Sequence, residues 1–333
     1  MRNLFRILCK CVFFVLIVCC LRDFFNRSLG GGAAVAFPLV SSVTVADKTS
    51  TTPKEDMNIN EELVKQVVEH AIRDYHPHGR AHAGGWGMWR RALPSVLDAV
   101  KSLQLPLHAA TGDVYQFGIF KGDSMKYLRK VFPDVRLVGC DSFVGLPEDS
   151  SGATVSGDWK RGRYSSGDIR DSLTKALGGP KGVALVKGFF NESLTNTLPQ
   201  QLNLKPAWYI DIDVDLYIST YQALDFMFGQ GLVHVGTIIG YDDWWPLSCQ
   251  SHKRHGKIVS PLDLAEGRAH AEIAIKYGAK FECIAGSCVN DKLGRIFSSS
   301  APIFLVTALG SQDSPNSGFN MTLREMLVHC FKR

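Results

Sequence analysis

The stretch PAWYIDIDVDLYIST, residues 206–220, has the apolar pattern of a buried β-strand but carries three aspartates. Successive side chains of a strand point to opposite faces, so Asp211, Asp213 and Asp215 are expected on one face of this strand. Neighbouring carboxylates repel one another, and burying them is costly unless they have partners. The stretch therefore predicts a bound cation, whose other ligands must come from elsewhere in the chain.

Apolar runs typical of strands alternate with helical patterns after Gly112. The strand runs cover residues 113–119, 135–140, 183–188, 207–213, 235–241, 280–285 and 302–309. Helical patterns cover residues 123–131, 167–177, 219–229 and 261–277. Strands separated by single helices form parallel units, whereas the last two runs have little helix between them. The predicted fold is an α/β, doubly wound, mostly parallel Rossmann-like sheet with an antiparallel last strand.

The 333 residues divide into five predicted segments. A signal anchor or signal peptide covers 1–29, and a linker rich in Gly, Ala, Ser and Thr covers 30–58. Helical periodicity begins at Asn60, so 59–111 is predicted to be an N-terminal helical segment that serves as a lid. The sheet domain spans 112–312, and a C-terminal tail spans 313–333.

The N-terminal segment predicts membrane association or entry into the secretory pathway. Its apolar run, CVFFVLIVCCL at residues 11–21, is shorter than the roughly 20 residues of a spanning helix and fits a signal peptide. If Arg6 and Lys10 extend towards the headgroups, residues 4–21 would instead form a short signal anchor. The alternative is an organelle, reached after cleavage of a targeting sequence.

The net charge and the cysteine usage argue against nucleic-acid-binding proteins and against proteins built on a disulfide framework. The net charge of +5 is mild, and the chain lacks zinc-finger spacing and RNA-binding signatures, so we expect no nucleic-acid partner. Outside the N-terminal segment the odd number of cysteines and the lack of C-x-x-C argue against a disulfide framework. Cys283 and Cys288 could pair in an oxidising compartment, but buried free thiols are favoured.

The first predicted strand ends in a glycine turn, QFGIFKGDS at residues 116–124. Gly118 and Gly122 would let a ligand approach the backbone closely, although their spacing is not that of the G-x-G-x-x-G fingerprint. Asp141 ends the next strand, where an acidic residue accepts hydrogen bonds from ribose hydroxyls in nucleotide-binding sheets. The alternatives are that the glycines only form a tight turn and that Asp141 caps a helix or a turn. The two features together favour a nucleoside site.

Two predicted neighbouring strands each end in an acidic pair, Asp213 with Asp215 and Asp242 with Asp243. Oxygen ligands of this kind suit Mg²⁺ or another small divalent cation. The alternative is that the second pair caps a turn while Asp213 pairs with an arginine. A cation would lower the pKa of a bound hydroxyl, and Asp215 could then accept its proton. Asp211 has no assigned role beyond a hydrogen bond to backbone or to a buried lysine.

Five segments in order resemble the macrocin O-methyltransferase family: VYQFGIFKGDS, DSFVGLPE, VKGFFNESLTNTLP, IDVDLYIST and GTIIGYDDWW. Members are class I enzymes that use S-adenosylmethionine to methylate sugar hydroxyls of antibiotics. The resemblance runs from about Gly112 to Gly278. It implies a metal held by Asp213, Asp242 and Asp243, a catalytic base at Asp215, and a methyltransferase domain over 112–312.

The same resemblance implies contacts to the methyl donor. The candidate donor-binding residues are Gln116, Gly118, Gly122, Ser124, Asp141, Ser142 and Gly188. Gln116 stands where family members usually carry Glu, which affects contacts at the amino-acid end of the donor. Trp244 replaces the common Tyr, and the usual Gly-Gly before the fifth strand is absent. Neither of these last two changes removes a metal ligand.

The predicted function is metal-dependent transfer of a methyl group from S-adenosylmethionine to a hydroxyl of a sugar or other small molecule. The alternatives are a membrane-anchored glycosyltransferase that uses D-x-D and a methyltransferase-like protein that binds without catalysis. A D-x-D phosphatase fits poorly, and the glycine turn with Asp141 argues against the glycosyltransferase. Specificity for the acceptor is expected in lid segments 76–92 and 244–262. A homodimer is compatible with the sequence.

Overall fold

Seven apolar strands form one sheet. They are β1 (Asp113–Phe117), β2 (Leu137–Asp141), β3 (Val183–Lys187), β4 (Ala207–Ile212), β5 (Ile238–Tyr241), β6 (Lys280–Ala285) and β7 (Ile303–Ala308). Their order across the sheet is β3-β2-β1-β4-β5-β7-β6. Strands β1 to β5 pair in parallel, whereas β7 runs antiparallel to both β5 and β6. The predicted doubly wound sheet with an antiparallel last strand is confirmed.

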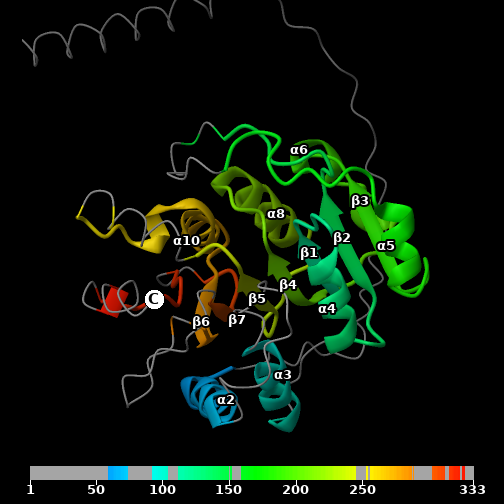
Figure 1. Cartoon of the computed structure of the whole chain (residues 1–333). Coiled ribbons are helices and arrows are strands. Elements are labelled where there is room, and N and C mark those ends of the chain that lie inside the picture. Colours follow the sequence, from blue (N-terminus) through cyan, green and yellow to red (C-terminus); the bar gives the residue numbers. More distant parts are fainter. Residues whose placement is uncertain are drawn as a thin grey trace, which may run out of the picture. The chain divides into compact units, whose positions relative to one another are not determined.

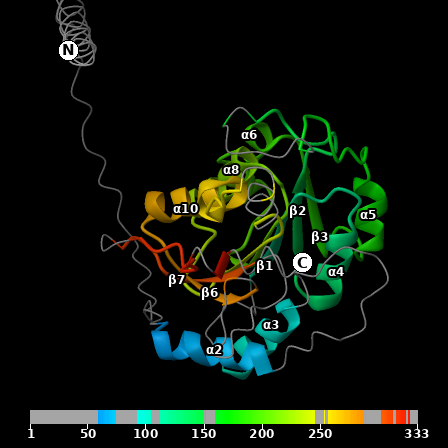
Figure 2. The ribbon, with the colours of Figure 1, turned by 60° about the vertical axis from the view of Figure 1, so that its left-hand side comes forward.

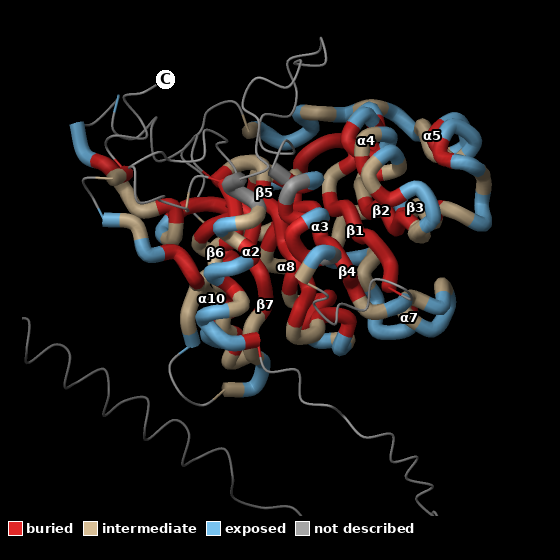
Figure 3. The backbone as a smooth tube through the Cα atoms, turned by 90° about the horizontal axis from the view of Figure 1, so that it is seen from below, coloured by how far each residue is buried: buried red, intermediate tan, exposed pale blue. Residues whose placement is uncertain are grey.

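Helices cover both faces of the sheet, as Figures 1 and 2 show. One layer holds α2 (Glu61–Arg73), α3 (Ala92–Ser102), α4 (Asp123–Val131) and α5 (Arg170–Ala176). The other holds α6 (Phe190–Ser193), α7 (Leu198–Gln201), α8 (Tyr217–Gly229) and α10 (Ala265–Tyr277). A short 3₁₀ helix, η2 (Pro261–Asp263), precedes α10. Because strand side chains alternate, the sheet contributes to two apolar cores, and its strands are the most deeply buried part of Figure 3.

The computed structural model describes part of the chain: residues 59–73, 92–103, 112–149, 151, 159–244, 253, 256–286, 288, 302–311, 315–322 and 325–326. The predicted signal segment, the linker and most of both predicted lid segments lie outside these ranges. Within them, no helix has both the length and the hydrophobicity needed to cross a membrane. The described part of the predicted C-terminal tail packs on the sheet, since Asn316 forms a bridge with Lys280.

A disulfide joins Cys283 and Cys288, with their Cα atoms 6.0 Å apart. The favoured prediction of free thiols was therefore wrong for this pair. Strand β6 ends at Ala285, and Gly286 then takes a positive φ of 85°, so the chain turns immediately after the strand. This turn returns the second cysteine to the first, which spacing alone does not reveal.

Gly118 connects the ends of the central strands β1 and β4. The Phe117 carbonyl accepts a hydrogen bond of 3.0 Å from the Asp213 amide, so the chain leaving β4 stays beside the turn that follows β1. A Cβ on Gly118 would collide with the carbonyl oxygen of Asp213, and its φ of +84° favours glycine. Glycine at this position is therefore required for the packing of the two loops.

The first prediction concerns this packing. Gly118→Ala should lower the free energy of unfolding by at least about 2 kcal/mol more than Gly178→Ala, because overpacking adds to backbone strain. Gly178 has a similar φ of +95° and no atom within 4 Å of an added Cβ, so it measures the strain alone. Urea unfolding of both variants checks the difference. Equal losses would contradict the tight contact with Asp213.

Candidate active site

Asp141, at the end of β2, binds the backbone of the glycine turn. Its Oδ2 accepts hydrogen bonds from the amides of Ile119 (2.6 Å) and Phe120 (3.0 Å), and its Oδ1 accepts one from Phe143 (2.5 Å). Charge-assisted bonds of this kind are strong. The carboxylate predicted to contact a ribose thus also shapes the turn, which agrees with the alternative that Asp141 is a cap.

Gln116 is buried beneath the same turn. Its Nε2 donates to the Gly118 carbonyl at 2.9 Å and to Ser124 Oγ at 2.5 Å. Its Oε1 is buried and has no hydrogen-bond partner among the described residues. Leaving a buried acceptor unpaired costs about 1–3 kcal/mol, so such atoms are uncommon. The unpaired oxygen is a candidate contact for a donor group of a ligand.

The other predicted donor-binding residues line the carboxyl ends of the first three strands. Gly122 precedes α4 in the left-handed conformation, with φ 81°. Ser142 Oγ donates to the Gly145 carbonyl at 2.7 Å and shapes the loop after β2. The Gly188 amide donates to the Asp141 carbonyl at 3.0 Å, which links the ends of β2 and β3. All of the predicted donor-site residues therefore lie along one edge of the sheet.

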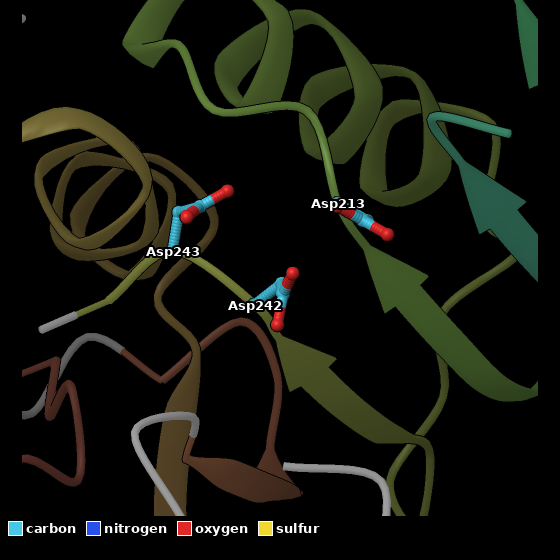
Figure 4. Close-up of side chains that lie close together, drawn as sticks. All are labelled: Asp213, Asp242 and Asp243. Atoms are coloured by element: carbon cyan, nitrogen blue, oxygen red, sulfur yellow. The ribbon is translucent and has the colours of Figure 1, made fainter. Parts of the chain in front are cut away.

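Asp213, Asp242 and Asp243 lie together at the ends of β4 and β5 (Figure 4). One carboxylate oxygen of each lies within 4.8 Å of those of the other two, and all three residues are half-buried. Residues 29 and 30 positions apart meet because β4 and β5 are parallel neighbours that pair Ile212 with Tyr241. The chains therefore leave the sheet side by side.

This group of oxygens fits a small divalent cation. An octahedral Mg²⁺ holds its ligands at about 2.1 Å, which places ligand oxygens roughly 3–4 Å apart. The three carboxylates would need to move together by less than about 1 Å to reach that spacing. Hard anionic oxygens are also the ligand type that Mg²⁺ prefers. The residues present thus fit such an ion in both chemistry and spacing.

Asp215 lies beside the acidic group, but not through the strand alternation that was expected to place it there. Strand β4 ends at Ile212, so strand alternation does not extend to this residue, which instead has a positive φ of 62°. The carboxyls of Asp215 and Asp243 are close enough for each to affect the pKa of the other. Burial and the charge of Asp213 raise the pKa of Asp215 well above its usual range. Burial and the charge of Asp215 likewise raise the pKa of Asp243.

Asp211 does not join this group. It is fully buried within β4, and its Oδ1 accepts a hydrogen bond of 2.9 Å from the hydroxyl of Tyr209. The two side chains lie on one face of the strand, two residues apart. One partner of Asp211 is therefore a tyrosine hydroxyl, a strong donor that needs no opposite charge.

Glu266 is an additional acid that the sequence analysis missed. It is fully buried in the first turn of α10 and accepts hydrogen bonds from the amides of Val214 (3.3 Å) and Asp243 (3.0 Å). Burial, followed by the charges of Asp243 and Asp242, raises its pKa well above the usual range. In the sequence it is one more acidic residue in a helical pattern, and only the tertiary contacts distinguish it.

His270 lies one helical turn after Glu266 and is also fully buried. Its Nδ1 is 2.7 Å from the Tyr241 hydroxyl, and its Nε2 is 2.9 Å from the Ser317 carbonyl. Since a carbonyl only accepts, Nε2 donates to Ser317 and Nδ1 accepts from Tyr241. The imidazole thus connects the end of β5, immediately before Asp242, to the C-terminal segment.

Strained residues gather in the loops at this edge. Among the described residues, those other than glycine with positive φ are Phe120, Phe143, Tyr164, Asn203, Asp215 and Ala265. All except Asn203 belong to loops that contain or contact the residues above, or, in the case of Ala265, to the first turn of α10. The Tyr164 ring lies edge-on to that of Phe120 at 5.7 Å. Burial and then the charges of Asp215 and Asp243 raise the pKa of Tyr164. Strain of this kind concentrates at functional sites.

The strand order, with its antiparallel β7 and a glycine turn after β1, is that of a Rossmann-like methyltransferase. The sequence profile of the macrocin-O-methyltransferase (TylF) family matches residues 83–264, more than half of the chain. The chain belongs to this family. It is an S-adenosylmethionine-dependent O-methyltransferase, as the resemblance implied.

Several solved structures are similar to the chain. The calicheamicin methyltransferase CalS11 has 17% identity over 74% of this chain and 91% of its own, with a TM-score of 0.43. The O-methyltransferase NovP has 16% identity over 74% of this chain and 98% of its own, with a TM-score of 0.40. The Podospora anserina methyltransferase PaMTH1, bound to S-adenosylhomocysteine, has 13% identity over 81% of this chain and 100% of its own, with a TM-score of 0.36. No curated protein sequence matches the chain at a significant level. The family assignment rests on the profile match.

The second prediction concerns His270. Burial lowers its pKa to about 4, whereas an unfolded imidazole titrates near pH 6.5. Between these values the unfolded state binds the additional proton, so stability falls as the pH falls. Acidification from about pH 7 to pH 5 should cost the wild type about 2 kcal/mol more than His270→Gln, which cannot titrate. Urea unfolding at both pH values measures this, and an equal loss in the two proteins would contradict a neutral, buried His270.

Proposed function

We propose that this protein uses a divalent cation, Mg²⁺ or a similar ion, to methylate a hydroxyl of a sugar or another small molecule. The observation that carries the proposal is the contact between Gly118 and Asp213. Through it, the glycine turn of β1 lies directly beside the carboxylates at the ends of β4 and β5. A methyl donor at the turn and an activated hydroxyl at the carboxylates would therefore be neighbours.

On the donor side, we assign the binding of S-adenosylmethionine to the edge formed by β1, β2 and β3. The donor supplies an electrophilic methyl group on a sulfonium centre. Gln116 offers its unpaired Oε1 to the ammonium group of the donor. Asp141 holds the amides of the turn and lies where a ribose is bound in related sheets. Ser124, Ser142 and Gly188 complete this edge.

On the acceptor side, Asp213, Asp242 and Asp243 would hold the cation. A cation there lowers the pKa of a bound hydroxyl and fixes the direction of its oxygen. Its positive charge would also offset the mutual repulsion of these carboxylates. Asp215, which lies close to Asp243, would then accept the hydroxyl proton as general base.

The acceptor would lie between the carboxylates and the rings of Phe120 and Tyr164. This pair joins the glycine turn to a loop that follows β2. Aromatic rings pack against the C–H faces of sugars, while the Tyr164 hydroxyl can bond to a sugar hydroxyl. A sugar acceptor agrees with the family, which is named for its action on macrocin.

The protein is further proposed to enter the secretory pathway or a membrane through residues 1–29, which lie outside the described residues. The disulfide between Cys283 and Cys288 supports an oxidising compartment, since disulfides are rare in reducing ones. The alternative of an organelle, the five-segment division of the chain and a homodimer stay predictions from the sequence.

The third prediction tests the base. Asp215→Asn should reduce methyl transfer at least about 100-fold, because an amide cannot accept the proton. Binding of S-adenosylhomocysteine, measured by calorimetry, should change less than about twofold, because the donor edge is formed by other strands. Asp225→Asn, an equivalent change on α8 at a carboxylate that pairs with Lys276, serves as the control. Normal turnover of Asp215→Asn would refute the assignment.

The fourth prediction tests the metal. The double variant Asp242→Ala, Asp243→Ala should lose Mg²⁺-dependent activity and Mn²⁺ binding. In chelator it should be at least as stable as the wild type, since two carboxyls that repel their neighbours are gone. Thermal unfolding with and without Mn²⁺ measures the stability and the Mn²⁺ binding, and a methyl-transfer assay with and without Mg²⁺ measures the activity. Full wild-type activity in chelator would exclude the cation from the reaction.

A further inference from the structure

Glu266 joins the loop after β4 to the loop after β5. One of its carboxylate oxygens accepts from the Val214 amide, which lies between Asp213 and Asp215. The other accepts from the amide of Asp243. A single buried side chain on α10 therefore contacts the backbone of both the loop after β4 and the loop after β5. These two loops carry all of the proposed cation ligands and the proposed base.

The first turn of α10 is itself held in place. Gly267 packs so tightly that an added Cβ would collide with the Pro261 carbonyl oxygen of η2. Ala265 has a positive φ of 36°, which is strained for a residue with a side chain. A carboxylate in the first helical turn also interacts favourably with the helix dipole. The backbone therefore fixes where the Glu266 carboxylate lies.

Only a carboxylate can serve both loops. Each of its oxygens accepts hydrogen bonds, whereas a glutamine in its place would turn an NH₂ group towards one of the two amides. The position nevertheless adds an acid to a region where Asp213, Asp242 and Asp243 already lie close together. A role in packing alone would not need this additional negative charge, whereas a bound cation would offset it.

We propose that Glu266 is a positioning residue for the cation: it sets the separation of the loop that bears Asp213 from the loop that bears Asp243. It acts through the two backbone amides and does not ligate the ion. This inference rests on the proposed metal-dependent function. It extends the site from the strand ends to α10, beyond the residues matched by the family profile.

The test is Mn²⁺ binding to the full chain, followed by the electron paramagnetic resonance signal of free Mn²⁺. Glu266→Gln should bind Mn²⁺ about 10- to 100-fold more weakly than the wild type, the usual effect of losing a group that orients metal ligands. S-Adenosylhomocysteine binding should stay within about twofold, since the donor edge is separate. Glu272→Gln, the same charge change on the same helix, pairs instead with Arg268 and should keep the wild-type Mn²⁺ affinity.

A second variant and a second condition keep the test decisive. Glu266→Asp is one methylene shorter and can reach only one loop, so it should also weaken Mn²⁺ binding and replaces Glu266→Gln if that variant does not fold. Each affinity is measured at two temperatures well below the unfolding midpoint in chelator. Weakening that disappears at the lower temperature would indicate partial unfolding and overturn the proposal.

The remaining outcomes separate this inference from the proposed function. Wild-type Mn²⁺ affinity in Glu266→Gln, or equal weakening in Glu272→Gln, would overturn the positioning role and leave the metal site standing. A wild-type chain that binds no Mn²⁺ would overturn the metal site itself, and the role of Glu266 with it.

Discussion

The contact between the Cα of Gly118 and the carbonyl oxygen of Asp213 is the constraint on which the site depends. Strands β1 and β4 are neighbours because the strand order reverses between them, and ligands bind at such a reversal in open α/β sheets. Any side chain at Gly118 would push the loop after β4 away from the glycine turn. Donor edge and acidic group would then separate, although each would keep its own internal hydrogen bonds.

The donor side and the acidic side of the site differ in charge and in hydrogen bonding. On the donor side, Asp141 accepts hydrogen bonds from three backbone amides, and the other predicted donor-binding residues are uncharged. On the other side, Asp213, Asp215, Asp242 and Asp243 crowd together, with raised pKa values at Asp215 and Asp243. Such crowding and the positive φ of Asp215 both oppose folding. The two apolar cores of the sheet supply the stability that permits them.

Features that depend on local pattern could be predicted from the sequence. Apolar periodicity located all seven strands, and the convergence of parallel strand ends brought Asp213 to Asp242 and Asp243. Features that depend on where a strand stops could not be predicted. Alternation was extrapolated through Asp215, yet β4 ends at Ile212 and the residue arrives by a left-handed turn. The disulfide was missed for the same reason, because a turn after β6 decides it.

Contacts between distant elements could not be predicted from the sequence, for another reason. Glu266 and His270 occupy one face of α10, and in the sequence they read as ordinary polar positions of a helix. In the fold they lie fully buried, one turn apart, and bind the backbone of Asp243 and the hydroxyl of Tyr241. The loops at the ends of the strands therefore carry the acidic side chains, and α10 binds the backbone of these loops. Since that helix begins after residue 264, where the family match ends, its part in the site follows from tertiary packing alone.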